Sequence, residues 1–379
     1  MRIAFVYDVP YPWHVGGIES MNFNEAEELA KVHEVHFFTT RWEGMKSNDF
    51  TYHGIHYHAF HTTGQSRIYR HGRRSIREAL AFSSSIRQLF NYDFDVVITN
   101  TFPILHLPLL KRYCRLKRAR LIMEVAEVWD RKYWRKYLGP ILGDLAYSYS
   151  MGAILGADFY ITISSVTSKR LAAFGVDKSS MLVFAPNLDN GKIDRICRER
   201  IARSKRVIFS GRMIKEKRLD KWLHLFSEAH RTDSSLKGLI IGNGPERSEL
   251  EGMIKDLGLG GSIDIPDFYA SSSELYRKIR GSSAVLHMSE REGLGIIAIE
   301  SIALGTPVIL PKDTPIPKEV REMCVVADEK SIPRKIVEIA NSKNLQKYIF
   351  NKKNLSIYSK SEVRTFYKTL FSRLGLRGK

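Results

Sequence analysis

The chain has 379 residues, which is more than one hydrophobic core usually holds and predicts two domains. Its composition, 44% hydrophobic and 26% charged, is typical of globular proteins and includes no low-complexity tract. Three widely spaced cysteines favour neither a disulfide framework nor a zinc site, and they fit a reducing compartment. The net charge of +18 favours an anionic partner such as a nucleic acid, a phosphorylated ligand or an acidic membrane.

Two apolar segments bear on targeting. The first, residues 3–7, is too short for the core of a signal peptide and predicts a buried strand. The longest, residues 141–163, contains Asp144 and Asp158, which argues against a membrane span. We therefore expect a soluble, cytoplasmic protein.

Short apolar runs alternate with helical patterns along the chain. In the first half, strands are predicted at residues 2–8, 34–40, 94–100, 119–125, 158–164 and 180–187, and helices at 20–31 and 165–174. A polar stretch, residues 188–205, is predicted to link the domains. The second half repeats the pattern, with strands at 206–211, 236–242, 262–268, 283–289 and 306–311, and helices at 219–230, 246–257, 273–279 and 295–304. The alternation predicts an α/β protein with two Rossmann-like, doubly wound parallel sheets, whose ligands bind at the carboxyl ends of the strands.

The stretch SEREGLGIIAIESIALGTPV, residues 289–308, carries two acids eight residues apart, Glu292 and Glu300. Gly293 and Gly295 allow a ligand close to the backbone, and a helix beginning near Gly295 offers free N–H groups that suit a phosphate. Glu300 falls on an apolar helix face, where a carboxylate is costly unless hydrogen-bonded. Two sugar hydroxyls would satisfy it. The alternative is that the glutamates simply reach solvent.

The same stretch resembles the E-x7-E signature of retaining glycosyltransferases of family 4, which have the GT-B fold. The resemblance implies that Glu292 contacts the donor sugar as part of the catalytic machinery and that Glu300 binds the ribose of the nucleotide, beside Gly293, Leu294 and Gly295. It also implies an acceptor-side domain at residues 1–187 and a donor-binding domain at 188–357, facing each other across a cleft. A C-terminal helix at about 358–379 is expected to return to the first domain.

A second segment, FSGRMIKEKRLDKWL at residues 209–223, is similar to the Gly-Arg-…-Lys segment of that family. The resemblance assigns Arg212 and Lys217 to the donor diphosphate as catalytic cations. A guanidinium and an ammonium suit phosphate oxygens, whereas a solvated basic loop is the alternative. The resemblance further implies that neither a metal nor another cofactor is required.

Two glycine turns match the family more weakly. Asn243 and Gly244 lie in a tight strand-to-helix loop that either lines the cleft or is only a turn. Gly16 and Gly17 would present backbone amides to the donor phosphates when the domains close, unless they form an ordinary turn. His14, just before them, is equally consistent with packing and with acceptor contact.

The sequence departs from the family at one position. In the segment IMEVAEVW, residues 122–129, Ala126 stands where many relatives carry a histidine close to the reaction centre. Glu124, Glu127 and Trp129 are the neighbouring acceptor-side candidates. No catalytic base can be named from the sequence.

These features predict transfer of a hexose from a nucleotide diphosphate sugar to a hydroxyl acceptor with retention at the anomeric carbon. The alternatives are a GT-B phosphorylase, a nucleotide-sugar epimerase, or a basic nucleic-acid-binding protein. The last leaves the two glutamates unexplained and shows no recognised binding signature, so we expect no nucleic-acid partner.

Basic residues concentrate between Arg67 and Lys136, a segment that contains 16 Lys and Arg but only 6 Asp and Glu. The rest of residues 1–185 contains 7 Lys and Arg and 11 Asp and Glu. Cations alternate with Tyr and Trp in residues 109–120 and 130–139. This pattern predicts docking on an anionic membrane, at its cytoplasmic face, to reach a lipid-linked acceptor. Ordinary amphipathic helices on a sheet, or a polysaccharide acceptor, are the alternatives.

Overall fold

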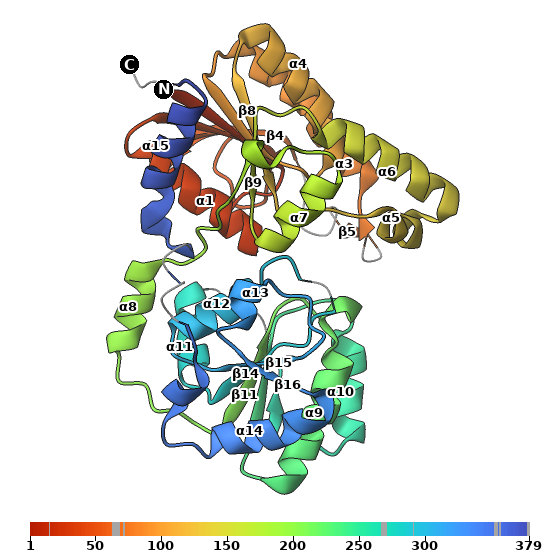
Figure 1. Cartoon of the computed structure of the whole chain (residues 1–379), viewed down its shortest axis with the longest axis vertical. Coiled ribbons are helices and arrows are strands. Elements are labelled where there is room, and N and C mark those ends of the chain that lie inside the picture. Colours follow the sequence, from red (N-terminus) through yellow and green to blue (C-terminus); the bar gives the residue numbers. More distant parts are fainter. Residues whose placement is uncertain are drawn as a thin grey trace. The chain divides into compact units, whose positions relative to one another are not determined.

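A computed structural model describes residues 1–14, 16–62, 69–70, 73–266, 271–290, 292–351, 355 and 358–376. The chain folds into two compact units. The first combines Met1–Asn187 with Ile357–Lys379, and the second is Leu188–Ser356 (Figure 1). Each is described by itself below.

The first unit is built on a sheet with the order β10-β9-β8-β7-β1-β2-β4-β3. Its strand pairs are parallel except for the pair of β3 with β4. The strands are β1 Arg2–Val6, β2 Glu34–Arg41, β3 Asp49–Tyr52, β4 Ile55–Thr62, β7 Val96–Asn100, β8 Arg120–Val125, β9 Phe159–Thr162 and β10 Met181–Val183. A short hairpin joins β5 Tyr69–Arg70 to β6 Arg73–Arg74. The helices are α1 Gly17–Ala30, α3 Ile76–Ser85, α4 Leu107–Lys117, α5 Arg131–Leu138, α6 Pro140–Ile154, α7 Ser165–Ala173 and α15 Val363–Arg373.

Apolar clusters cover both faces of this sheet. Because neighbouring residues of a strand point to opposite faces, Ala4 and Val6 of β1 join the cluster formed with α3, α4, α6 and α7, whereas Ile3 and Phe5 join the cluster formed with α1 and α15. A strand that is buried on both faces reads as a continuous apolar run, and this is why the sequence signal for β1 is clear.

The C-terminal helix α15 packs against α1, and the two lie side by side in the first unit (Figure 1). Val363, Tyr367 and Leu370 are completely buried in the cluster that α1 shares. This confirms the expected return of the terminal helix to the first domain. Residues 377–379 of the predicted helix lie outside the described residues.

The second unit has an entirely parallel sheet with the order β13-β12-β11-β14-β15-β16. Its strands are β11 Arg206–Ser210, β12 Lys237–Ile241, β13 Ile263–Asp264, β14 Ala284–Leu286, β15 Val308–Pro311 and β16 Val325–Ala327. Its helices are α8 Asn190–Arg198, α9 Leu219–Thr232, α10 Arg247–Asp256, α11 Ser272–Arg280, α12 Ile296–Ala303, α13 Lys318–Arg321 and α14 Ile332–Ala340. Helices α9, α10 and α14 share one apolar cluster with the sheet. The predicted α/β class with two parallel-sheet domains is confirmed.

The polar stretch 188–205 differs from the expected linker, because half of it forms helix α8 of the second unit. Ile193 and Ile196 are buried, and the Asp189 side chain accepts the backbone N–H of Lys192 at the helix start. Most residues of this nine-residue helix are polar, so its sequence resembles a linker, but the two isoleucines lie on one face and pack inward. No described helix is both long and apolar enough to cross a membrane.

Candidate active site

Three loops of the second unit meet at the carboxyl edge of its sheet. They follow β11, β12 and β14, which are neighbours with β11 in the centre. The loops bond to each other through the backbone: Met213 N–H donates to the Asn243 carbonyl at 2.9 Å, and Glu290 N–H donates to the Glu216 carbonyl at 2.8 Å. The sheet therefore gathers the predicted segments around residues 212–217, 243–244 and 289–295 into one surface.

Glu292 lies on this surface in direct contact with a predicted cation. Lys217 Nζ donates to Glu292 Oε2 at 2.8 Å and to Ser289 Oγ at 3.2 Å, while His287 Nε2 lies 3.4 Å from the same carboxylate oxygen. Burial alone would raise the pKa of Glu292, but Lys217, His287 and the Gly295 N–H outweigh it and lower the pKa to about 2. Glu292 is therefore ionised at any physiological pH.

The turn into α12 needs glycine at one position. Gly295 precedes the helix with φ +82°, and a Cβ there would lie 2.4 Å from Ile316 Cδ1. Its N–H donates to Glu292, although the sequence predicted that this group would be free for a phosphate. Gly293 is partly exposed, and Leu294 is buried beside it.

Glu300, on α12, has a different environment. The Tyr276 hydroxyl of α11 donates to Glu300 Oε1 at 2.6 Å. Burial raises the pKa of Glu300 to about 7, although Tyr276 and the more distant Lys192 lower it. The carboxyl group thus titrates near neutral pH, in contrast to Glu292.

The remaining predicted residues of the second unit stand at the rim of the same edge. Arg212 is exposed just after β11, and Asn243 is exposed just after β12. Asn243 Oδ1 accepts the N–H of Gly244 at 2.8 Å. A Cβ on Gly244 would lie 2.3 Å from the Met213 carbonyl oxygen, so this glycine lets two loops touch.

Gly16 and Gly17 form the start of α1 in the first unit. Gly16 is the N-cap residue, and a Cβ on it would lie 2.2 Å from Glu19 Oε2. His14 Nδ1 lies 3.5 Å from Glu19 Oε1, and its ring is 5.2 Å from that of Trp42. His14 therefore makes packing contacts within its own unit.

Glu124, an acceptor-side candidate, lies in a buried acidic cluster under α15. Tyr367 Oη is 2.9 Å from Glu25 Oε2 and 3.3 Å from Glu124 Oε1. Burial and the neighbouring Glu124 raise the pKa of Glu25 well above its usual value, and burial raises that of Glu124. Burial thus favours the protonated forms of these two acids, and their contacts with Tyr367 tie α15 to the sheet.

The other acceptor-side candidates follow β8. Trp129 Nε1 donates to Glu127 Oε2 at 2.8 Å, and both side chains are partly exposed. The Trp129 ring contacts Phe102 at a centroid distance of 4.9 Å. Ala126, where a histidine was expected, accepts the Thr167 hydroxyl through its carbonyl at 3.3 Å.

Sequence reasoning missed three residues that shape the site. His287 lies 3.4 Å from Glu292, Ser289 accepts a hydrogen bond from Lys217, and Tyr276 donates one to Glu300. A histidine within the apolar strand segment 283–289 was a usable signal for the first. No sequence signal marked Tyr276, because it lies 24 residues before Glu300 and belongs to another helix.

Within the described residues, no group of three or more His, Cys, Asp or Glu side chains is placed to hold a metal ion. The single Asp-x-Asp spacing, Asp93 and Asp95, stands before β7. Asp93 pairs with Lys117 at 2.7 Å, and Asp95 accepts the backbone N–H of Arg2 at 2.8 Å. Both acids therefore have structural partners.

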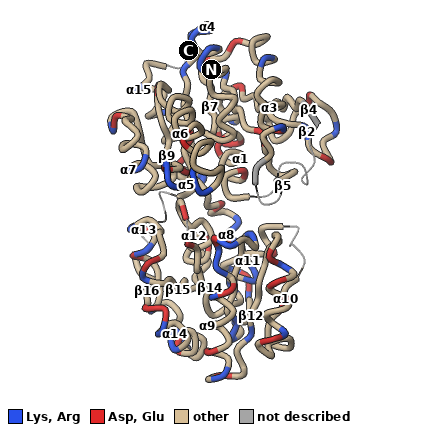
Figure 2. Tube along the Cα trace, turned by 90° about the vertical axis from the view of Figure 1, so that its right-hand side faces the viewer, with Lys and Arg blue, Asp and Glu red and all other residues tan. Residues whose placement is uncertain are grey.

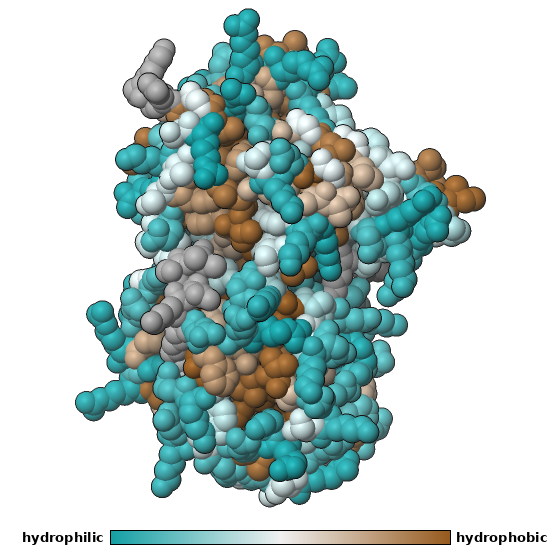
Figure 3. Space-filling model, viewed as in Figure 1, coloured by the Kyte–Doolittle hydropathy of each residue, from teal (hydrophilic) through white to brown (hydrophobic). Residues whose placement is uncertain are grey.

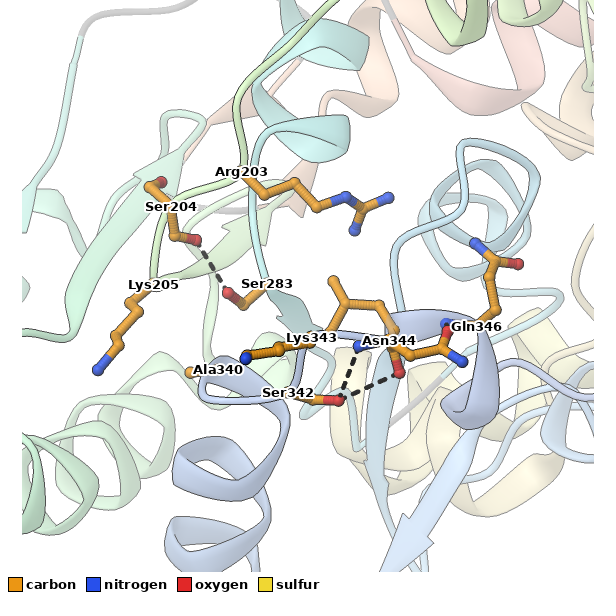
Figure 4. Close-up of a pocket in the computed structure, with 10 residues that line it drawn as sticks. Arg203, Ser204, Lys205, Ser283, Ala340, Ser342, Lys343, Asn344 and Gln346 are labelled. Carbon is orange, nitrogen blue, oxygen red and sulfur yellow. Dashed lines mark hydrogen bonds between the residues drawn. The ribbon is translucent and has the colours of Figure 1, made fainter.

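A cavity of about 340 Å³ opens at the opposite, amino-terminal edge of the second sheet. Figure 4 shows Arg203, Ser283 and Lys343 among its lining residues. Arg203 donates to the Gly305 carbonyl at 2.7 Å, just beyond the end of α12. This cavity is separate from the edge that carries Glu292, because Arg203 and Ser283 precede β11 and β14.

Solved structures resemble the whole chain. The Anabaena HepE protein in complex with UDP and glucose covers 98% of this chain and 100% of its own, with 14% identity and a TM-score of 0.70. The match to sucrose-phosphate synthase from Thermosynechococcus elongatus covers 98% of this chain and 99% of that enzyme, with 13% identity and a TM-score of 0.72. The match to a trehalose-6-phosphate synthase studied for glycosyl transfer with retention covers 98% of this chain and 99% of that enzyme, with 10% identity and a TM-score of 0.70. The fold is that of the GT-B glycosyltransferases.

Family models match both units. Residues 15–189 match the model described as Glycosyltransferase Family 4, and residues 197–353 match that of the Glycosyl transferases group 1. The chain thus belongs to the glycosyltransferases of family 4. N-acetyl-alpha-D-glucosaminyl L-malate synthase from Bacillus anthracis is 21% identical over 148 residues, which are 37% of this chain and 38% of that enzyme.

Proposed function

We propose that the protein transfers a hexosyl group from a nucleoside diphosphate sugar to an acceptor hydroxyl, with retention at the anomeric carbon. The observation that carries the proposal is the Lys217–Glu292 ion pair at the carboxyl edge of a parallel sheet, one loop before the helix that presents Glu300. Support comes from structural neighbours that hold UDP and glucose or are studied for transfer with retention.

The cations of this edge would act on the leaving group. When the bond between the anomeric carbon and the phosphate oxygen breaks, negative charge collects on the diphosphate. Lys217 and Arg212 would offset this charge, and such electrostatic stabilisation is commonly the largest catalytic term. The acceptor oxygen then bonds to the anomeric carbon on the same face, and its proton passes to the departing diphosphate.

Glu292 would orient the transferred sugar. It is ionised, so both oxygens can accept hydrogen bonds, and hydrogen bonds from Lys217 and the Gly295 N–H restrain it. Glu300 would accept a ribose hydroxyl. In this arrangement the charge balance at the leaving group is supplied by side chains, without a metal ion.

The donor can be identified by a thermal-shift panel of UDP, GDP, ADP and their sugars, because a ligand that binds only the folded protein raises its melting temperature. We expect one nucleotide series to stabilise the protein. NMR of the product made with an α-linked donor should show an α-linkage. Inversion would contradict retention, consumption of donor by inorganic phosphate would indicate a phosphorylase, and sugar isomerisation without an acceptor would indicate an epimerase.

The first unit carries an exposed apolar surface that we call the α5–α6 tip, formed by Ile141, Leu142, Leu145 and Tyr149. These side chains are 75%, 61%, 63% and 44% exposed and lie on one face of α6. Figure 3 shows hydrophobic surface at the projecting end of α6. Surface of this kind is characteristic of a binding site.

Basic residues flank the α5–α6 tip. Arg131 and Arg135 both bind Asp144, with Nη2–Oδ2 distances of 2.8 and 2.6 Å, and so fasten α5 to α6. Lys132 and Lys136 are exposed and pair with no described acidic residue. The cations of α5 are marked in Figure 2. We propose that this tip inserts into an anionic bilayer and brings the first unit to a lipid-linked acceptor.

Replacing Leu142 and Leu145 by serine should weaken binding to vesicles containing phosphatidylglycerol by about a hundredfold or more, since each buried leucine contributes about 1.5–3 kcal/mol. Leu116→Ser, on α4, is the control because that leucine is 61% exposed outside the tip. Co-sedimentation provides the measurement. Equal binding to neutral and anionic vesicles, or no loss in the double variant, would overturn the membrane proposal and favour a soluble glycan acceptor.

A further inference from the structure

The two acids of the proposed donor site are held in opposite ways. Glu292 has an ammonium, an imidazole and a backbone N–H around it, whereas Glu300 accepts one hydrogen bond from a described residue, that of Tyr276. The bond is short, at 2.6 Å, and Tyr276 is only 4% exposed. A buried hydroxyl in this position has little freedom, so it determines where the carboxyl group points.

Helix α11 supplies this hydroxyl from well outside the acidic motif. Tyr276 stands one turn after Ser272, and Ser272 Oγ accepts Lys192 Nζ of α8 at 2.9 Å. Helices α8, α11 and α12 are therefore linked through side chains that converge on Glu300. The charged or titratable groups that act on Glu300 are Tyr276 from α11 and Lys192 from α8.

We propose that Tyr276 is the positioning residue of Glu300: its hydroxyl fixes Oε1 and leaves Oε2 to receive a ribose hydroxyl of the donor. This inference rests on the proposed function, because it takes the nucleotide as the ligand of Glu300. Tyr276 lies outside the acidic motif, so the inference adds a residue to the proposed nucleotide site. Because Tyr276 occupies Oε1 of Glu300, the ribose would bind mainly through Oε2.

The same hydrogen bond affects ionisation. A donor to the charged carboxylate stabilises it, so Tyr276 lowers the pKa of Glu300 against the opposing effect of burial. Protonation below about pH 7 removes acceptor capacity and should weaken nucleotide binding. Without Tyr276, the pKa rises further, and the pH at which affinity is lost moves upward.

The test compares the wild type with Tyr276→Phe, using UDP, GDP and ADP as probes in calorimetry between pH 6 and 9. At pH 6.5 the variant should bind the preferred nucleotide at least about tenfold more weakly, as expected for the loss of one hydrogen bond to a charged group, and it should approach wild type at pH 9. The donor KM should rise while kcat at saturating donor stays within about twofold. Discrimination against the 2′-deoxynucleotide should also shrink.

Tyr348→Phe is the matched control. Tyr348 is 7% exposed in the same unit, and its hydroxyl donates to Glu338 Oε1 of α14 at 2.9 Å. This variant should leave the pH profile of nucleotide binding unchanged. A loss that is equal at every pH in Tyr276→Phe would indicate a merely structural role and would overturn the inference.

A ligand-free measurement separates the two levels of the proposal. In protein labelled with ¹³C at the glutamate carboxyl carbons, the Glu300 signal, assigned with Glu300→Gln, should titrate near pH 7 and move to higher pH in Tyr276→Phe. If this shift occurs but no nucleotide binds, the proposed function fails while the Tyr276–Glu300 coupling stands. If nucleotides bind but the titration does not move, the positioning role is wrong.

Discussion

Lys217→Ala should lower kcat by about two to three orders of magnitude, the usual cost of removing one group that stabilises developing negative charge. In the free protein Lys217 donates to Glu292 and Ser289. Its ammonium is thus already held at the edge where the diphosphate would leave. The variant also leaves the Glu292 carboxylate without its main counter-charge, so the pKa of Glu292 should rise. Steady-state kinetics with the donor found in the thermal-shift panel provides the measurement.

Lys215→Ala is the appropriate control for this experiment. Lys215 lies in the same short turn, Lys215–Lys217, and is exposed. The two variants remove the same charge two residues apart, so a general electrostatic effect would lower both rates equally. A kcat for Lys217→Ala within threefold of wild type would refute the proposed role of this lysine at the leaving group.

Gly244→Ala should destabilise the second unit by about 1–3 kcal/mol, the usual cost of inserting a methyl group into a well-packed region. The new Cβ would lie 2.3 Å from the Met213 carbonyl oxygen, and backbone atoms cannot yield as a side-chain end can. The loop after β11 must move, and Arg212 and Lys217 move with it. We therefore expect at least a tenfold loss of kcat in addition to a lower unfolding temperature, measured by calorimetry and kinetics.

The comparison for Gly244 is Gly252→Ala. Gly252 lies inside α10, and a Cβ there meets nothing within 4 Å. Alanine should stabilise the helix by about 0.8–1 kcal/mol through its better propensity. Wild-type stability in Gly244→Ala would show that the two loops separate easily, contrary to the backbone hydrogen bond between Met213 and Asn243.

The fold was largely predictable because strands buried on both faces appear as apolar runs. The segments that became β1, β7 and β8 carry this signal. Strands β3 and β4 were missed. In β4, buried Ile55, Tyr57 and Ala59 alternate with His56 and His58, so no apolar run marks the strand. Helix α8 was missed for a related reason, since its two buried isoleucines are outnumbered by charged residues.

The candidate site was predictable in part. Lys217 and Glu292 were named from local patterns, and the structure brings them into contact. Glu124 shows the opposite outcome. Its place at the end of β8 suggested a cleft residue, whereas Tyr367, 243 residues away, encloses it in a buried cluster. A carboxylate has the same local sequence signal whether it meets solvent or a distant hydroxyl.

By itself, the sequence determined the alternation of strands and helices, the glycine turns and the identity of the acids and cations that follow the strands. These features depend on side-chain periodicity and backbone freedom, which are local. Only the tertiary structure decided that Glu292 is ionised beside Lys217 while Glu300 titrates near neutral pH under Tyr276. The ionisation of a buried acid depends on desolvation and on partners within a few ångströms, and folding brings those partners from separate elements of the chain.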